Sequence, residues 1–368
     1  MKAIRENMPL TAIRGLAAAW VAAGHVLPIW FPYVGTALGP VLAMSHTAVD
    51  VFFILSGFIL TQVYGVMRLN QAPMFWLRRI CRIYPLHLSV MAAIALLIVT
   101  AAALGRSAHN SHDWTSFGVV TLLLQPFLLG DTPWNPPSWS IGVELLCYVL
   151  FPLTRRLMRR ASDLLLVCLA AMLAMLEAHV LYLHAGATTG SGAILRGLSG
   201  FHLGAALSLL VPRLPVSAAP TLALTGSVGI ALGINASSPA ATVLSAAVLI
   251  FALAPSRGLV AHVLSCGPLV WLDRVSFSIY LLHVQLLSVL DRALSSSVDP
   301  RVKVVIFLAI LLALSEVTYR FIEQPGRRLP MVIKAKIRSI RCTLAETEVG
   351  VRRRITETQC PLSETDAQ

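Results

Sequence analysis

Long apolar runs recur along this chain, and they constrain its fold more than any other feature. Apolar stretches of about 15 to 22 residues, long enough or nearly long enough to cross a bilayer as helices, follow one another up to position 322. The chain is 57% hydrophobic and only 12% charged, whereas soluble domains carry roughly 25% charged residues. A water-soluble fold could not bury so much apolar surface, and the alternating strands of a membrane barrel are absent from the pattern. The sequence therefore predicts an all-α, polytopic membrane protein.

Ten segments are expected to cross the membrane, which places both ends of the chain in the cytoplasm. These spans cover residues 10–30, 46–66, 85–104, 138–153, 163–183, 192–211, 219–234, 239–254, 276–293 and 302–322. With this topology, 22 of the 29 lysine and arginine residues lie on the cytoplasmic side, as the positive-inside rule favours. The formal charge of +12 is therefore explained by the topology in the membrane and does not indicate nucleic-acid binding.

Two further apolar stretches, 117–130 and 259–271, are too short for a simple crossing. If 117–130 crossed alone, the basic run "RRLMRR" would move outside and the charge bias would weaken. We therefore expect 117–130 to be re-entrant or interfacial. Residues 1–330 form one membrane domain in this interpretation, and residues 331–368 form a polar cytoplasmic tail. The six cysteines contain no CxxC pair, so neither a metal site nor a disulfide framework is indicated.

The first span carries ionisable groups on one face. In "RGLAAAWVAAGH", Arg14 and His25 are eleven residues apart, which is almost three helical turns and roughly 16 Å along the axis. An ionisable group inside a bilayer costs at least about 2.5 kcal/mol and is a functional candidate by default. The spacing alone slightly favours a structural interpretation, with an arginine that reaches the interface and a buried, hydrogen-bonded histidine.

Other spans add further ionisable residues. "HTAVDVFFILSGF" places His46 and Asp50 one turn apart at the start of the second span, where Asp50 is either a functional group or an ordinary charge in the first helical turn. Later in the chain, His283 is expected to be a core histidine. Glu316 and Arg320 lie one turn apart and are expected to pair with each other.

The stretch "PPSWSIGVELLCYVLFP" carries the most distinctive polar pattern. A helix is expected to begin at Ser138 or Ser140, because serine is a good N-cap. Ser140, Glu144 and Tyr148 then follow at four-residue spacing and share one helix face. Glu144 is the only acidic residue of this span and needs a partner in the membrane. His25 is a candidate for that partner, and a structural ion pair with another helix is the alternative.

Basic residues gather at the cytoplasmic mouth of the third span. "WLRRICRIYPLH" contains Arg78, Arg79 and Arg82. Such a cluster is either ordinary positive-inside charge or a site where guanidinium groups bind phosphates in bidentate fashion. No glycine-rich phosphate loop is present in the sequence, so side chains would have to hold any nucleotide.

Taken together, these stretches resemble the membrane acyltransferase 3 family, whose members O-acylate sugars, polysaccharides and some antibiotics. The arginine–histidine spacing of "RGLAAAWVAAGH" matches the leading signature of the family. The other matching stretches follow in the family's order: "AVDVFFILSGFIL", "RRICRIYPLH", "PPSWSIGVELLCYVLFP", "FSIYLLH" and "RFIEQPGRRL". Any one of these motifs is weak, but six in order are a strong signal, and they cover nearly the whole hydrophobic part of the chain.

The resemblance implies a ten-helix bundle, an acyl-coenzyme A donor on the cytoplasmic side, acetyl by default, and an acceptor hydroxyl that is often on the far side. His25 matches the essential histidine of the family, Arg14 its essential arginine, and Glu144 the acid of its serine–tryptophan–serine motif. Where relatives often carry a second acid, this chain has Leu145, which argues against a role for two carboxylates. No permanently bound cofactor is expected.

On this basis we expect the donor's phosphates to bind Arg14 together with Arg78, Arg79 and Arg82, while the pantetheine arm reaches His25. An imidazole, whose unperturbed pKa is about 6.5, can act there as a general base or carry the acyl group itself. The other candidates are Glu144 and Asp50, which would orient the imidazole, and His46, Ser138, Trp139 and Ser140, which would contact the substrate.

Several alternatives remain open at this stage. The acceptor is a sugar, exopolysaccharide, lipopolysaccharide or lipid-linked saccharide, with a macrolide-type small molecule as the alternative. A transferase with a lipid-linked sugar donor, a secondary transporter and a non-catalytic scaffold are the rival classes, although the two repeated halves typical of many transporters are not visible. We expect the protein in the bacterial plasma (inner) membrane, in contact with lipid and without nucleic acid, and homo-oligomerisation stays open.

Overall fold

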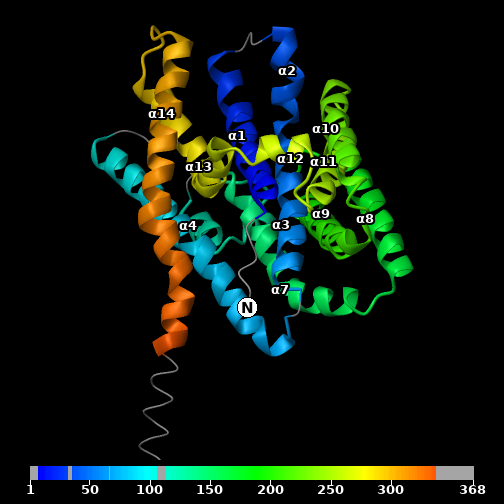
Figure 1. Cartoon of the computed structure of the whole chain (residues 1–368). Helices are drawn as coiled ribbons and strands as arrows, with labels where there is room; N and C mark the ends of the chain where they lie inside the picture. Colours follow the sequence, from blue (N-terminus) through cyan, green and yellow to red (C-terminus); the bar gives the residue numbers. More distant parts are fainter. Residues whose placement is uncertain (1–6, 32–34, 66, 106–112, 337–368) are drawn as a thin grey trace, which may run out of the picture.

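The computed structural model describes residues 7–31, 35–65, 67–105 and 113–336. Over these ranges the chain forms helices and contains no β-strand, and the helices pack side by side in a bundle (Figure 1). The chain is thus an all-α protein, as predicted. Lys2, Arg5 and residues 337–368 of the predicted tail lie outside the described ranges.

Each of the ten predicted spans falls on a helix. The first five are α1 (Met8–Trp30), α3 (Ala48–Val63), α4 (Ala72–Ala103), α7 (Ser138–Met158) and α8 (Asp163–His184). The others are α9 (Gly190–Leu210), α10 (Ala219–Asn235), α11 (Pro239–Ala252), α13 (Gly267–Ala293) and α14 (Pro300–Thr318). Because α4 begins well before position 85, Arg78, Arg79 and Arg82 lie on the same helix as the apolar run that follows.

Within the described part of the chain, six helices are long and apolar enough to cross a membrane. They span Met8–Trp30, Leu38–Val63, Leu69–Ala103, Asp163–His184, Gly190–Arg213 and Pro300–Lys336. α7 and α13 are less apolar because they carry charged residues such as Glu144 and Asp273. The structure is therefore that of a multi-pass membrane protein, while the number of crossings and the side of the termini stay predictions.

Short elements interrupt the bundle at the places where the sequence lacks a full span. The segment 117–130 forms two short helices, α5 (Trp114–Thr121) and α6 (Gln125–Leu128), separated by a turn in which Leu123 has a φ of 60°. Neither helix is long enough to cross a bilayer, in agreement with the prediction for this stretch. The remaining short elements are α2 (Gly35–Ala43), η1 (Met44–Thr47), η2 (Leu69–Gln71), η3 (Val211–Arg213), α12 (Leu259–Leu264) and the π-helix η4 (Tyr319–Glu323).

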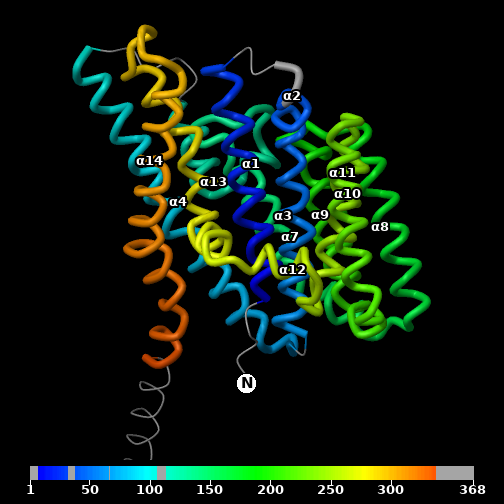
Figure 2. The backbone as a smooth tube through the Cα atoms, turned by 45° about the horizontal axis from the view of Figure 1, so that its top comes forward, coloured from blue at the N-terminus to red at the C-terminus, as the bar shows by residue number. Residues whose placement is uncertain are grey.

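Glycine residues allow the central helices to approach closely. A β-carbon at Gly57 would lie 1.8 Å from the carbonyl oxygen of Phe201, and Gly204 makes the reciprocal contact, so α3 and α9 can cross this closely only at glycine. α1 crosses α13 in a similar way at Gly15, where a β-carbon would lie 2.7 Å from the backbone nitrogen of Asp273. α1 is thus held between α3 and α13 (Figure 2).

Candidate active site

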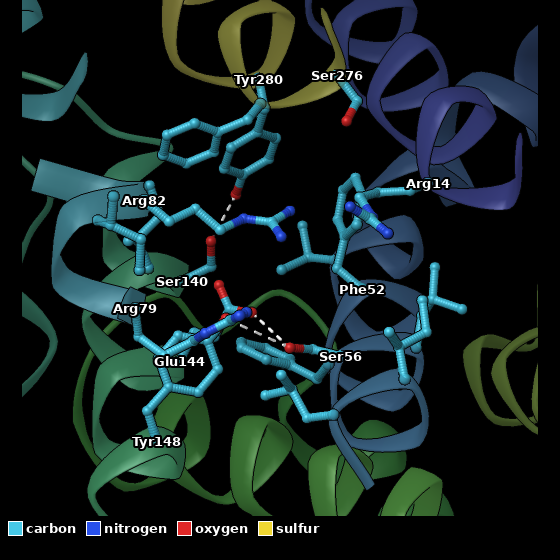
Figure 3. A pocket seen from close by; sticks show the side chains of 18 residues that line it. Arg14, Phe52, Ser56, Arg79, Arg82, Ser140, Glu144, Tyr148, Ser276 and Tyr280 are labelled. Carbon is cyan, nitrogen blue, oxygen red and sulfur yellow. Dashed lines mark hydrogen bonds between the residues drawn. The ribbon is translucent and has the colours of Figure 1, made fainter. Parts of the chain in front are cut away.

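A cavity of about 110 Å³ is bounded by α1, α3, α4, α7 and α13 (Figure 3). Its polar side chains are those of Arg14, Ser56, Arg79, Arg82, Ser140, Glu144, Tyr148, Ser276 and Tyr280. Glu144 is the only carboxylate among the described residues that line it, against three guanidinium groups. A few polar groups that converge in an otherwise apolar hollow are typical of a ligand site, and here their net charge is positive.

The three guanidinium groups come from two helices. Nε of Arg14, on α1, lies 3.5 Å from Oδ1 of Asp273. On α4, Arg79 donates a hydrogen bond to the Tyr64 hydroxyl at 3.3 Å, with its guanidinium carbon 5.6 Å from the centre of the Tyr64 ring. One turn further along α4, Arg82 makes neither a hydrogen bond nor an ion pair with any residue that the structure describes. Its guanidinium group points into the cavity (Figure 3).

Within the described part of the chain, Arg82 is therefore a cation without an ion-pair partner. Three like charges act on it, those of Arg327, Arg14 and Arg79. Sequence analysis singled out Arg14, Arg79 and Arg82, which the structure brings together, but it missed Arg327. Arg78, the fourth predicted phosphate ligand, is half-buried and does not line the cavity. A guanidinium group that has other guanidinium groups near it and no paired carboxylate favours an anionic ligand.

The carboxylate of Glu144 faces these cations from α7. Its Oε1 accepts a hydrogen bond from the Tyr148 hydroxyl at 2.5 Å and another from the Ser56 hydroxyl at 2.6 Å. Ser140, Glu144 and Tyr148 all line the cavity, which confirms that they share one face of the helix. Within the described residues, Glu144 has no contact with His25, so the predicted pairing of these two groups is wrong.

The start of α7 also differs from the prediction. Pro137 occupies the N-cap position, and no side chain caps the helix. The Ser138 hydroxyl donates instead to a carbonyl in the preceding turn at 2.7 Å. Ser140 lies within 2.8 Å of the Tyr280 hydroxyl and lines the cavity, whereas Ser138 and Trp139 are buried away from it.

His25 lies outside the cavity, and its side chain is exposed. Its Nδ1 donates to the backbone carbonyl of Val21 at 2.9 Å, so Nε2 carries the free lone pair of the neutral ring. The centre of the His25 ring lies 5.1 Å from that of His283, and the His283 ring lies 6.0 Å from the ring of Tyr280. His25 is thus connected to the cavity through two residues of α13.

Asp50 has a different role from the predicted one. Its two carboxylate oxygens accept hydrogen bonds from Nε and Nη2 of Arg196, on α9, at 2.9 and 2.8 Å. Both side chains are at most 1% exposed. A buried carboxylate requires a cation at this distance, and Asp50 therefore does not orient His25. Arg196 lies inside the apolar run that forms α9.

The backbone segments that carry His25 and His46 contact each other, but neither histidine lines the cavity. A β-carbon at Gly24 would lie 1.8 Å from Oγ of Ser45, so α1 crosses η1 beside both histidines. Nδ1 of His46 donates to the carbonyl of Ala43 at 2.9 Å. His46 does not line the cavity.

The helical segment that follows α14 brings Arg327 toward Arg82. The predicted pair is confirmed, with Nε of Arg320 2.5 Å from Oε1 of Glu316. The next turn is a π-helix, a distortion that is frequent at functional sites. It ends at Glu323, which is buried and accepts hydrogen bonds from Ser278 at 2.5 Å and from Arg327 at 2.9 Å.

Comparisons with known proteins identify relatives of this chain. Acyltransferase MdmB of Streptomyces mycarofaciens is 35% identical over 157 residues, which cover 41% of this chain and 40% of MdmB. Protein 2 in the picA locus of Rhizobium radiobacter is 32% identical over 39% of this chain and 78% of its own length. YrhL of Bacillus subtilis (strain 168), provisionally assigned as a peptidoglycan O-acetyltransferase, is 24% identical over 76% of this chain and 50% of its own length. The matches thus span half or less of the lengths of MdmB and YrhL.

No solved structure matches the chain. The family described as "Acyltransferase domain" matches residues 10–320. Because this match covers most of the chain, including His25, His283 and the residues that line the cavity, the chain belongs to the acyltransferase domain family.

Proposed function

We propose that this protein is an integral-membrane O-acyltransferase that transfers an acyl group, by default acetyl, from acyl-coenzyme A to a hydroxyl group of a glycan or lipid-linked saccharide. The observation that carries the proposal is the unpaired guanidinium group of Arg82 in a cavity shared with Arg14 and Arg79. Acyl-coenzyme A is a polyanion with a thioester at the end of a narrow arm. A cluster of guanidinium groups at one end of an apolar bundle suits such a donor.

In the proposed complex, the donor's phosphates interact with Arg14, Arg79 and Arg82. Ser56 and Tyr148 keep the Glu144 carboxylate on the α7 wall, where it limits the excess of positive charge. In this complex the acyl end passes Tyr280 on its way to His25, because the rings of Tyr280 and His283 link the cavity wall to His25.

The acyl transfer step is assigned to His25. Its Nε2 takes the proton of the acceptor hydroxyl while the hydroxyl oxygen bonds to the acyl carbon. The carbon–sulfur bond breaks, and the leaving thiolate receives the proton from the imidazolium. General base catalysis of this kind is worth about 10² to 10⁴ in rate. Transfer through an acyl-histidine is the second route open to the same side chain.

A glycan acceptor is supported by the relative YrhL, whose provisional name refers to peptidoglycan O-acetylation. The donor requires access to the cytoplasm, so we place the arginine-lined end of the bundle on the cytoplasmic side of a bacterial plasma membrane. The basic residues that close α7, among them Arg155 and Arg156, agree with this orientation under the positive-inside rule.

The proposal is tested with acetyl-coenzyme A labelled in the acetyl group and with inside-out membrane vesicles. Vesicles that contain the wild type should incorporate label into glycans or lipid-linked saccharides, whereas His25→Ala should not. His184→Ala serves as the matched control, because His184 is an exposed histidine at the end of α8, outside the cavity. Equal labelling by the wild type and His25→Ala, above vesicles without the protein, would remove His25 from the reaction.

Donor binding is measured separately and needs no acceptor. Coenzyme A should raise the thermal unfolding midpoint of the detergent-purified wild type by mass action. The absence of any stabilisation by millimolar coenzyme A would contradict the proposed donor, even if label transfer had been seen in crude vesicles.

A further inference from the structure

The His25 ring lacks the partner that a catalytic histidine usually has. In many enzymes a carboxylate holds the imidazole and stabilises its charged form. Here the two candidate carboxylates are engaged elsewhere, Glu144 with Ser56 and Tyr148, and Asp50 with Arg196. Nδ1 of His25 is held by a backbone carbonyl of its own helix. The orientation of the ring is thus explained, but the stabilisation of its positive charge is not.

The neighbour of His25 is a second histidine. His283 is 0% exposed, and the centres of the two rings are 5.1 Å apart, with 56° between their planes. Nδ1 of His283 donates to the carbonyl of Ile279 at 3.1 Å. A carbonyl can only accept, so Nε2 of the neutral ring carries a free lone pair. This Nε2 is buried and has no hydrogen-bond partner in the described part of the chain.

A buried acceptor without a partner is rare and calls for an explanation. His46, His87 and His202 also have a buried ring nitrogen without a partner in the described part of the chain, so the His25 ring beside it is what distinguishes His283. The ring that carries this lone pair lies 5.1 Å, centre to centre, from the ring that becomes positively charged during the proposed reaction. The same helix face also carries Tyr280, whose hydroxyl lies 2.8 Å from Oγ of Ser140 in the cavity wall, so α13 fixes His283 relative to both the cavity and His25.

We infer that His283 is a positioning residue of the acyl transfer reaction: its neutral imidazole holds the His25 ring, and its unprotonated Nε2 stabilises the positive charge that His25 acquires when it takes the acceptor's proton. This inference rests on the proposed function, in its general-base form. His283 moves no proton itself, and the hydroxyl proton still passes from the acceptor to His25 and then to the leaving thiolate.

The test compares two substitutions at this position. His283→Phe keeps an aromatic ring against His25 and Tyr280 but removes both nitrogens. His283→Gln places a polar acceptor near the position of Nε2. Initial rates of label transfer from acetyl-labelled coenzyme A into the fraction that the wild type labels are measured against donor concentration, with the amount of each variant determined in the same vesicles.

A matched control is available at His202 on α9. Nδ1 of His202 donates to the carbonyl of Leu198 at 2.7 Å, and its buried Nε2 also lacks a partner. Its ring neighbour is Phe201 rather than His25. His202→Phe therefore removes the same chemical groups from the same kind of helix position, without removing a neighbour of His25.

We expect His283→Phe to lower kcat about 10- to 100-fold, as loss of a favourable interaction with a charged group does. KM for acetyl-coenzyme A should stay within about twofold, because the donor's phosphates bind elsewhere. His283→Gln should recover part of kcat, and His202→Phe should match the wild type.

Three outcomes would overturn the inference while leaving the proposed function intact, as long as His25→Ala is inactive. The first is a wild-type kcat for His283→Phe. The second is an equal loss for His283→Phe and His283→Gln with weakened coenzyme A stabilisation, which would mean that His283 only packs. The third is an equal loss for His202→Phe. If the wild type transfers no label in any vesicle, the proposed function fails and the inference fails with it.

Discussion

At the scale of single residues, the environment of Arg82 is the main support for the proposed donor. Most buried arginines in proteins have a carboxylate, as Arg196 has in Asp50. Arg82 has none among the residues described, although three other guanidinium charges act on it. An anion in the cavity would reduce the repulsion among these guanidinium groups. We therefore propose that the cavity binds an anionic ligand.

Arg82→Gln should therefore weaken donor binding. We expect KM for acetyl-coenzyme A to rise about 10- to 100-fold, because a hydrogen bond to a charged group is lost, while kcat changes much less. Arg78→Gln is the matched control from the same helix, since Arg78 does not line the cavity. Donor titrations in vesicles measure both values. An equal rise in KM for Arg78→Gln would mean that the whole basic run acts through general electrostatics.

Residue contacts could be predicted from the sequence only where they are local. Glu144 and Tyr148 share a helix face because four residues make about one turn. The sequence therefore predicts that these side chains are neighbours, as their hydrogen bond shows. The pairing of Asp50 with Arg196 joins residues 146 positions apart. No spacing rule connects two such residues, and His25 and His283 are separated even further. These contacts depend on which helices become neighbours.

At the scale of elements, hydropathy locates helices well and their ends poorly. The apolar run predicted a span from residue 85, but α4 begins at Ala72. The helix continues through the arginine-rich stretch because a proline in its first turn favours helix initiation, and because arginine is a good helix former. A hydropathy profile detects apolar runs and therefore does not detect polar helix ends of this kind. In α4 the polar end is the part that reaches the cavity.

The crossing of α3 and α9 predicts a strong dependence on Gly57. In Gly57→Ala the new β-carbon would meet backbone atoms of Phe201 at 1.8 Å, so a whole helix has to move rather than a side chain. We expect a loss of about 1 to 3 kcal/mol or more in stability, as for overpacked cores. The thermal unfolding midpoint of the purified protein measures this loss. Gly118→Ala is the control, because nothing lies within 4 Å of its β-carbon, and an equally large effect there would contradict the packing argument.

At the scale of the whole molecule, the arrangement of the helices separates two ends of different character. Nη2 of Arg155 donates to the carbonyl of Gly65 at 2.6 Å, and Arg79 bonds to Tyr64. The end of α7, the end of α3 and the start of α4 therefore lie together, and α7 and α4 carry arginine residues there. α1 begins at this end of the bundle, and the helical segment that continues α14 as far as Lys336 ends there (Figure 2). The opposite end carries His25 and the loop between α13 and α14.

This polarity predicts which end faces the cytoplasm. We expect the basic end to be cytoplasmic, because positive charge is retained on that side during insertion. The prediction is tested with single cysteines in a background whose six cysteines are replaced by serine. Arg160→Cys, beyond the end of α7, and Ser297→Cys, between α13 and α14, are both exposed. In intact spheroplasts a membrane-impermeant maleimide should label Ser297→Cys at once and Arg160→Cys only after the membrane is permeabilised. The reverse pattern would place the arginine cluster outside the cell, away from cytoplasmic acyl-coenzyme A, and would contradict the proposed donor together with the topology.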